Sequence, residues 1–237
     1  MKTLKDVYDV VDKAGMSTVE IATSVLRFGV IFEILPAGGA LPARPLADQV
    51  SEAIGTDVSP TTIIKALNVL ANEHLVHSTG WGYVVPSISR DEMNEAFRMR
   101  LLVEEQLVRA SVPLARTAVL EDARKILHSY DPLKDNAYLR YEWNTKFHMT
   151  LYSASKLYLT LDFVRSLIPV CYRYVHYYFS IHPHNDSGGN LYETDKVEHF
   201  DLLQAYEDRD VERAVNIINK HLSVTAKLFQ ERLERSL

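Results

Sequence analysis

The sequence predicts a mainly α-helical protein in two parts: three short helices with a β-hairpin, then an all-helical antiparallel bundle. Short helical patterns before residue 88 end in a glycine-rich hairpin signal, Gly80-Trp81-Gly82. After the break at Pro86-Ser87-Ile88-Ser89, apolar residues recur at helical spacing almost to the C-terminus. We therefore expect two domains, residues 1–88 and residues 89–237.

The first expected helix runs from Thr18 to Leu35. Ser17 or Thr18 would cap its start, with Glu20 in the first turn. The run Pro36-Ala37-Gly38-Gly39 ends the pattern. Both ends are therefore marked by residues that favour helix termini.

The rest of the first part is expected to hold two helices and a hairpin. Leu46 to Ile54 would form the second helix, closed by Gly55. The third would begin at Ser59 as its N-cap, with Pro60 in its first position. Two short strand patterns follow, at 75–78 and 83–85. Three helices followed by a hairpin is the order of a winged helix-turn-helix.

The second part reads as six antiparallel helices that enclose a possible ligand cavity. Pro113, Pro132 and Pro183 lie near expected helix ends, whereas Pro169 lies inside the fourth helix and should kink it. The expected spans are roughly 90–112, 119–130, 136–155, 157–180, 193–207 and 210–235.

Composition limits the classes of function. The 237 residues carry a formal net charge of -5, so no global basic field attracts nucleic acid. The single cysteine, Cys171, excludes a disulfide framework and suits a reducing compartment. No signal-peptide core or run of 18 apolar residues occurs, so we expect a soluble, cytoplasmic protein with no membrane partner. Motifs for phosphate-binding loops, dinucleotide binding and serine hydrolysis are also missing from the sequence.

Three histidines are the strongest functional signal. His148, His199 and His221 each fall on the apolar stripe of a different expected helix, and Asn144 lies one turn before the first. Imidazoles are costly to bury without partners, so three facing one interior indicate a shared ligand. Three imidazoles and an amide oxygen suit a divalent metal such as zinc, nickel, manganese or iron. The alternative is that each histidine is an ordinary hydrogen-bonded core residue.

Several longer motifs occur in a consistent order along the chain. The first part contains LRFGVIFEILPAGGALPARPLA, SPTTIIKALNVLANEHLV and GWGYVV. The second contains RLLVEEQLVRASVPLA, NTKFHMTLYSAS and EHFDLLQAYEDRDVERAV. With these motifs, nearly the whole chain resembles GntR-type transcriptional regulators of the FCD (FadR C-terminal domain) branch.

The resemblance implies a metal site at Asn144, His148, His199 and His221. In metal-binding members of the branch, the site resembles an Asp-x-x-x-His pair plus two later histidines. Asn144 stands where those members have the aspartate, so it is a departure from the pattern. Its amide oxygen is a weaker donor than a carboxylate and leaves the site one unit more positive. A carboxylate effector would supply the missing charge, or Asp195, one turn before His199, would substitute.

The resemblance also points to an effector cavity. Arg100, in an R-x-x-x-E pattern with Glu104, would capture a small carboxylate in bidentate fashion. The alternative is an ordinary ion pair between these two residues on a solvated face. Arg173, within a tyrosine-rich stretch, is a second candidate cation, although that stretch equally suits packing or a dimer surface.

The DNA-binding part departs from the family pattern. Typical members carry S-R-x-x-x-R at the recognition helix, and here Pro60 and Ile64 replace both arginines. Residues 1–88 contain six Lys or Arg and nine Asp or Glu, a local net charge of -3. We therefore expect weak or unusual recognition of operator DNA. The remaining candidate contacts are Arg44, Ser59, Thr61, Thr62 and Lys65, with the backbone amides of Gly80 and Gly82.

The leading hypothesis is a homodimeric, ligand-responsive transcriptional regulator and not an enzyme. A small organic acid would bind in the bundle, at or near the metal, and bias the arrangement of two DNA-binding heads. The alternative is a ligand-binding or protein-interaction module that has lost sequence-specific DNA binding. A metalloenzyme is a third hypothesis, but neither an H-E-x-x-H motif nor a carboxylate pair supports it.

Overall fold

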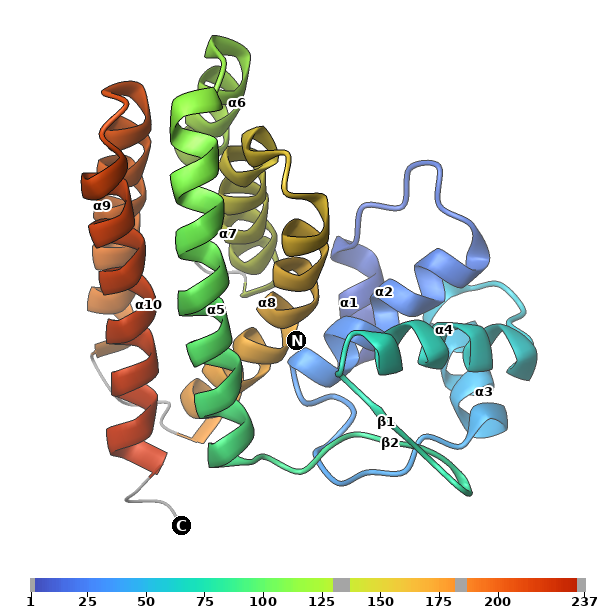
Figure 1. Ribbon diagram of the computed structural model, residues 1–237. Coiled ribbons are helices and arrows are strands. Elements are labelled where there is room, and N and C mark those ends of the chain that lie inside the picture. Colours follow the sequence, from blue (N-terminus) through green and yellow to red (C-terminus); the bar gives the residue numbers. More distant parts are fainter. Residues whose placement is uncertain (1–2, 130–136, 182–186, 234–237) are drawn as a thin grey trace. The chain divides into compact units, whose positions relative to one another are not determined.

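The computed structural model describes residues 3–129, 137–181 and 187–233 and confirms the mainly helical fold. The chain divides into two compact units (Figure 1). The first contains Met1–Ser89 and Tyr172–Tyr177, and the second contains Arg90–Cys171 and Tyr178–Leu237. The first unit thus takes in one segment of a helix that the sequence pattern placed wholly within the bundle.

Within its described residues, the first unit contains four complete helices, a β-hairpin and the Tyr172–Tyr177 segment of a later helix. Ser17 caps α2 through a capping box with Glu20, as predicted, and Gly55 closes α3 in the left-handed conformation. Ser59 caps α4, and Pro60 occupies its first position. The elements are α1 (Leu4–Val10), α2 (Thr18–Ile31), α3 (Ala43–Ile54), α4 (Pro60–Asn72), β1 (His77–Thr79) and β2 (Gly82–Val84).

The sequence pattern did not predict helix α1. Its seven residues are too few to show a helical period, but Thr3 and Asp6 form a capping box that marks its start. Leu4 and Val7 are buried, and α1 packs on both α2 and α3. Helix α3 begins at Ala43, three residues earlier than expected, and is therefore longer than the sequence pattern indicated.

The hairpin is the wing of a winged helix-turn-helix. His77 pairs with Val84 and Thr79 with Gly82, and an isolated bridge joins Ala40 to Val84. The chain must turn sharply before this bridge, because a Cβ on Gly39 would lie 2.8 Å from the carbonyl oxygen of Pro36. The described strands therefore form a small antiparallel sheet beside the helices.

The core of the first unit lies between α2, α3 and α4. Leu26, Val50 and Leu67 are almost fully buried, and each comes from a different one of these helices. Arg27 of α2 makes two hydrogen bonds, of 2.8 and 2.6 Å, to Glu73 at the end of α4. Apolar burial supplies the stability, and this ion pair fixes the end of α4 against α2.

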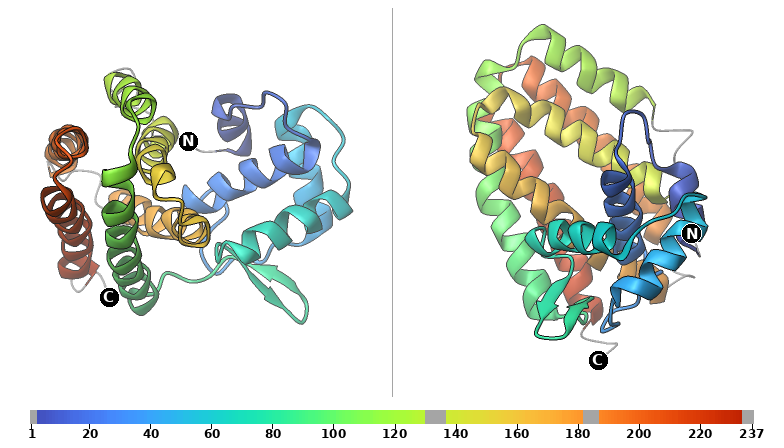
Figure 2. Two further views of the ribbon diagram at one scale, coloured as in Figure 1. Left: turned by 45° about the horizontal axis from the view of Figure 1, so that its top comes forward. Right: turned by 90° about the vertical axis from the view of Figure 1, so that its right-hand side faces the viewer.

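The second unit is a helical bundle (Figure 2). Helix α10 packs along α5 and α9, and α6 packs against α7 and α9. Pro169 lies inside α8, as predicted, and the helix continues to Ile181. The kink expected at Pro169 stays a prediction. The elements are α5 (Arg90–Ser111), η1 (Val112–Leu114), α6 (Thr117–His128), α7 (Ala137–Tyr152), η3 (Ser153–Ser155), α8 (Tyr158–Ile181), α9 (Ser187–Glu207) and α10 (Val211–Leu233). No described helix is both long enough and apolar enough to cross a bilayer.

Candidate metal centre and nucleic-acid interface

Three helices of the second unit bring the predicted histidines together. His148 comes from α7, His199 from α9 and His221 from α10, and candidate ligand nitrogens of the three lie within 4.8 Å of one another. The exposed fractions are only 1% for His148 and His199 and 9% for His221. On each helix the histidine lies on the apolar face, which packs toward the interior. One buried cluster therefore forms from residues that are up to 73 positions apart in the sequence.

The two most buried rings are in direct contact. The Nε2 atoms of His148 and His199 lie 2.9 Å apart, so one ring donates its proton to the other. Phe147 and Trp143 pack edge-on against His199, each with ring centroids 5.0 Å away. Aromatic walls exclude water from this side of the cluster, which strengthens every electrostatic interaction within it.

Asn144 joins the cluster as predicted from its spacing. Its side-chain amide lies 3.2 Å from Nε2 of His199. An amide can present either its nitrogen or its oxygen after a half-turn about the Cβ–Cγ bond. All four residues of the expected site therefore converge, whereas the side chain of Asp195 lies outside the described residues.

Burial shapes the protonation of the cluster. Desolvation lowers the pKa of His148 well below its usual value, and the neighbouring His199, His221 and Arg100 lower it further. A neutral imidazole is the form that binds a metal. The site thus favours the ligating state of His148.

The donor set fits a divalent metal. Metal–nitrogen bonds of about 2.0–2.1 Å place neighbouring ligand nitrogens roughly 3.0–3.5 Å apart. The 2.9 Å separation between His148 and His199 is close to this spacing. Three imidazoles and one amide oxygen suit zinc, nickel, manganese or iron, with coordination positions left for a ligand.

A carboxylate and a hydroxyl group support two of the three rings. Nδ1 of His221 lies 3.0 Å from Oε2 of Glu198, and Lys220 lies 3.2 Å from the other carboxylate oxygen. Burial raises the pKa of Glu198, but His221 and Lys220 outweigh it, so the net shift is downward. On the opposite side, Tyr152 lies 3.4 Å from Nδ1 of His148. The sequence pattern did not predict that Glu198 supports His221, because the two residues are 23 positions apart in the chain.

Arg100 forms the expected pair with Glu104, but on a buried face and not a solvated one. Its Nε donates to Oε1 of Glu104 over 2.5 Å, and the two residues are 8% and 0% exposed. Burial lowers the pKa of Arg100, but the charge of Glu104 reverses this and raises it overall. Tyr152 donates to the second oxygen of Glu104 over 2.7 Å. Arg100 is therefore connected to His148 through Glu104 and Tyr152.

Arg173 has a structural partner. It is 1% exposed and donates to the carbonyl oxygen of Pro86 within the first unit. Its predicted part in effector binding stays a prediction. Cys171, two residues earlier, is buried, and burial raises the pKa of its thiol to about 12.

The candidate DNA contacts lie on α3, α4 and the wing. Ser59 accepts a hydrogen bond from the backbone N–H of Thr62 over 3.1 Å, and the two hydroxyls lie 3.0 Å apart. Ser59 is thus the N-cap of α4, as predicted, and Thr62 supplies the backbone N–H that it caps. Arg44, Thr61 and Lys65 are exposed, as is Gly82, whose φ is +133°.

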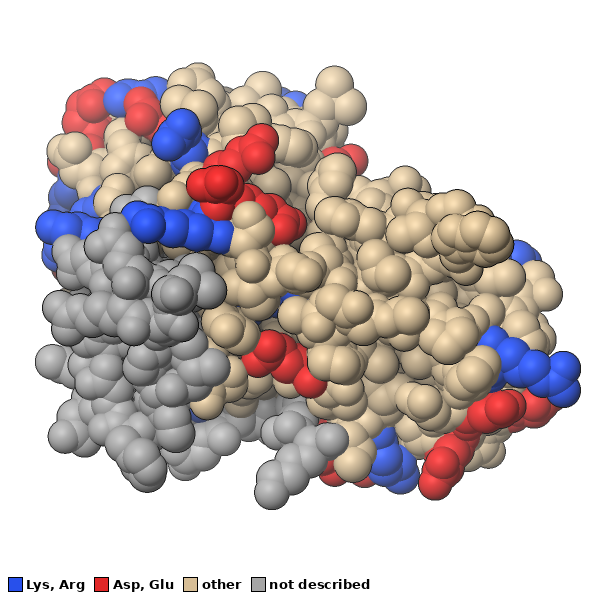
Figure 3. Space-filling model, turned by 90° about the horizontal axis from the view of Figure 1, so that it is seen from below, with Lys and Arg blue, Asp and Glu red and all other residues tan. Residues whose placement is uncertain are grey.

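The wing presents an apolar tip. Trp81 is fully exposed, and the turn that carries it is closed by hydrogen bonds from Thr79 to Gly82 and from Trp81 to Thr79. Tyr83 of β2 donates to Asn68 of α4 over 2.5 Å, which fixes the wing to that helix. The face of the first unit in Figure 3 is mostly uncharged, with charged side chains of both signs toward its outer edge.

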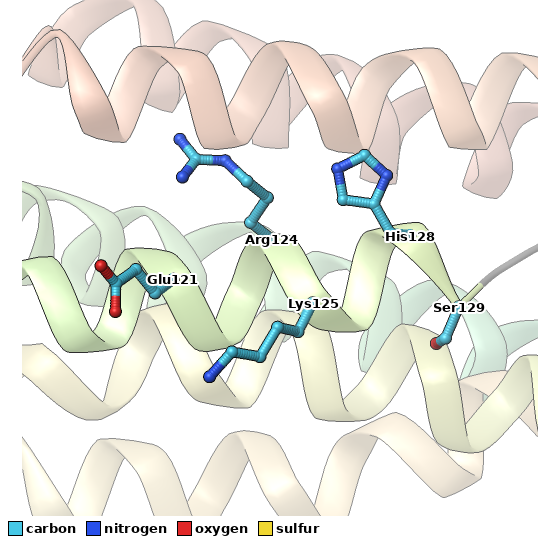
Figure 4. Close-up of a pocket in the computed structure, with 5 residues that line it drawn as sticks. All are labelled: Glu121, Arg124, Lys125, His128 and Ser129. Carbon is cyan, nitrogen blue, oxygen red and sulfur yellow. The ribbon is translucent and has the colours of Figure 1, made fainter.

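A shallow surface pocket on α6 is a weaker candidate site (Figure 4). Its two basic side chains are already paired, Arg124 with Glu207 and Lys125 with Asp122. Helix α6 supplies four of the five lining residues and Ser129 directly follows it, so the pocket lacks the converging polar groups typical of a binding site.

Comparisons with known proteins agree with this architecture. The family model described as the FCD domain matches residues 95–224. The solved structure titled E. coli McbR/YncC has a TM-score of 0.75 at 18% identity, covering 92% of this chain and 99% of that one. A protein from Rhodococcus sp. RHA1, titled a putative transcriptional regulator GntR, has a TM-score of 0.68 at 17% identity, covering 90% and 98%. No curated protein sequence matches the chain significantly.

Proposed function

We propose that this chain, which belongs to the FCD domain family, is a transcriptional regulator that responds to a small ligand. The first unit has the winged helix-turn-helix order, and the fold is similar to solved structures titled as GntR regulators. The observation that carries the sensing role is the buried convergence of His148, His199 and His221 from three helices. The protein would act as a cytoplasmic homodimer on operator DNA.

The sensing site would hold a divalent metal through the three histidines and Asn144. When bound, the metal supplies a Lewis-acid centre with open coordination positions. The donor set itself carries no negative charge, so a small organic acid would complete it through its carboxylate. Arg100 is already occupied by Glu104 and contributes to the surrounding charge; the proposed docking point for the effector is therefore the metal.

The proposed DNA-binding surface uses few cations. Lys65 and Arg44 would contact phosphates, together with Thr61 and the backbone amide of Gly82. A local net charge of -3 opposes nonspecific attraction to DNA, so we expect modest affinity that depends weakly on salt. Ser59 and Thr62 would contribute mainly by holding the start of α4.

A binding module without DNA recognition is the second candidate, favoured by the loss of both recognition-helix arginines. Promoter capture from sheared genomic DNA at low salt, with and without zinc and a panel of small carboxylic acids, separates the two. Enrichment of discrete promoters supports the regulator, and its absence under every condition supports the module. A catalytic role is not proposed, because the sequence has neither an H-E-x-x-H motif nor a carboxylate pair. Glu198, the carboxylate next to the cluster, is already paired with His221 and Lys220.

A further inference from the structure

We infer that two carboxylates outside the donor set, Glu198 and Glu104, fix the tautomers of His221 and His148 so that both Nε2 atoms carry lone pairs. This inference rests on the proposed metal site and deepens it. Glu198 acts directly on His221, and Glu104 acts on His148 through the hydroxyl of Tyr152.

The Glu198 contact is direct. A carboxylate only accepts hydrogen bonds, so the 3.0 Å contact with Nδ1 of His221 places a proton on that nitrogen. Nε2 of a neutral His221 then carries a lone pair, and this is the form that binds a metal. Glu198 is 8% exposed and sits on α9 one residue before His199, so the same helix supplies a ligand and the support for a ligand on α10.

The Glu104 contact works through a relay. The hydroxyl of Tyr152 has one proton, which it donates to Oε2 of Glu104 over 2.7 Å. Its oxygen can then only accept from His148, whose Nδ1 lies 3.4 Å away. Nδ1 of His148 therefore carries the proton, and Nε2 faces His199 with its lone pair.

The third ring completes this proton arrangement. Because Nε2 of His148 is unprotonated, the 2.9 Å contact requires His199 to donate from its own Nε2. The amide of Asn144, 3.2 Å from the same nitrogen, must then face it with its oxygen and not with Nδ2. His199 is thus the ring that must change tautomer when a metal binds. His148 and His221 are already in the ligating form and lose no free energy to rearrangement.

The two supports differ in charge. Glu104 is neutralised by Arg100, whose guanidinium shares its burial, so the relay orients His148 without adding net charge. The partner of Glu198 is Lys220, whose side chain is 68% exposed and largely solvated. Glu198 therefore leaves more uncompensated negative charge near a cluster that has none of its own, and its removal should weaken metal binding more.

Zinc affinity of the full-length protein, measured by competition with a chromophoric chelator, tests this inference. Substituting an outer hydrogen-bond partner of a metal ligand typically costs 10- to 100-fold in affinity. We expect about 10-fold from Glu198→Gln, which keeps an acceptor but loses the charge, and about 100-fold from Glu198→Ala. Tyr152→Phe, which breaks the relay, should cost about 10-fold.

Two matched variants serve as controls. Glu207→Gln alters a carboxylate of α9 that pairs with Arg124, and Tyr206→Phe removes a buried hydroxyl that contacts Ser111. Within the described residues, neither Arg124 nor Ser111 is hydrogen-bonded to a histidine of the cluster, so both control variants should bind zinc as the unaltered protein does. Equal affinity in Glu198→Ala, Tyr152→Phe and the controls would overturn the inference and leave the metal site standing.

The tautomers of His148 and His221 can also be determined directly in the metal-free protein, independently of its zinc affinity. Long-range ¹H–¹⁵N correlation spectra distinguish the two imidazole tautomers. His148 and His221 should both show the Nδ1–H form, and Tyr152→Phe should convert His148 to a mixture. An Nε2–H form for both rings in the unaltered protein overturns the inference. Failure of His148→Ala to reduce bound zinc overturns the metal site as well, whereas promoter capture tests the regulator separately.

Discussion

The Nε2 atoms of His148 and His199 lie 2.9 Å apart, although the residues are 51 positions apart in the sequence and belong to α7 and α9. Two imidazoles that face each other in a dry interior are satisfied either by a shared proton or by a shared metal.

Replacing His148 with alanine should reduce bound zinc to background. His148 is the ring connected to both His199 and the Tyr152 relay, so its loss removes a ligand and the order of its neighbours. Elemental analysis after dialysis against zinc measures the change. His77, which is exposed on β1, provides the control substitution. Equal metal in His148→Ala and His77→Ala would show that the cluster is not the site.

Replacing Asn144 with aspartate should tighten zinc binding by about 10-fold or more, since a charged oxygen donor is stronger than an amide. Asn144→Ala should weaken it. Competition titrations of the three proteins give the order of affinity. If a carboxylate effector binds at the metal, Asn144→Asp should also weaken effector binding, because the added negative charge opposes it. An affinity order in which Asp is weaker than Asn would contradict the assignment of this residue as an oxygen donor.

The two tryptophans are separate reporters. Trp81 is fully exposed on the wing, whereas Trp143 is buried with its ring 5.0 Å from that of His199. In Trp143→Phe, emission from Trp81 should shift on addition of captured promoter DNA and stay unchanged on addition of nickel. In Trp81→Phe, nickel should quench emission from Trp143. If Trp81 responded to nickel and Trp143 responded to promoter DNA, the placement of the metal site and of the DNA-binding surface would both be contradicted.

Lys65 should be a phosphate contact. Lys65→Ala is expected to weaken promoter binding several-fold and to reduce the slope of log affinity against log salt by about one. Its exposed position on α4 predicts no change in the midpoint of thermal unfolding. Ser59→Ala should show the reverse pattern, a loss of about 1 kcal/mol in the free energy of unfolding with the salt slope preserved. Identical salt slopes for Lys65→Ala and the unaltered protein would remove Lys65 from the interface.

Acid should destabilise the protein partly through His176, which lies in the first unit against the ring of Phe32. Burial lowers its pKa to about 4, below the usual 6.5. Between these values the unfolded chain binds a proton that the folded chain does not, so stability falls as the pH decreases from 6.5 toward 4. His176→Gln should flatten this fall in urea titrations at pH 7, 5.5 and 4.5. His77→Gln, at an exposed position, should follow the unaltered protein.

The sequence by itself determined the order of most helices and the residues that point inward. Caps such as Ser17 and Ser59 marked helix starts because they act on neighbouring backbone groups. The periodic stripes placed His148, His199 and His221 on core-facing sides, since side-chain direction along a helix follows from local geometry. Helix α1 was not predicted, because seven residues are too few to show a helical period. Its capping box residues, Thr3 and Asp6, are nevertheless present in the sequence.

Tertiary structure alone decided which partners these residues meet. Glu198 and His221 are 23 positions apart, and Tyr152 and Glu104 are 48 apart, so no local pattern could pair them. Packing also put the Arg100–Glu104 pair in the interior and grouped residues 172–177 with the first unit. The physical reason is that periodicity fixes the face of a residue, whereas its partner depends on how neighbouring helices are aligned along their lengths.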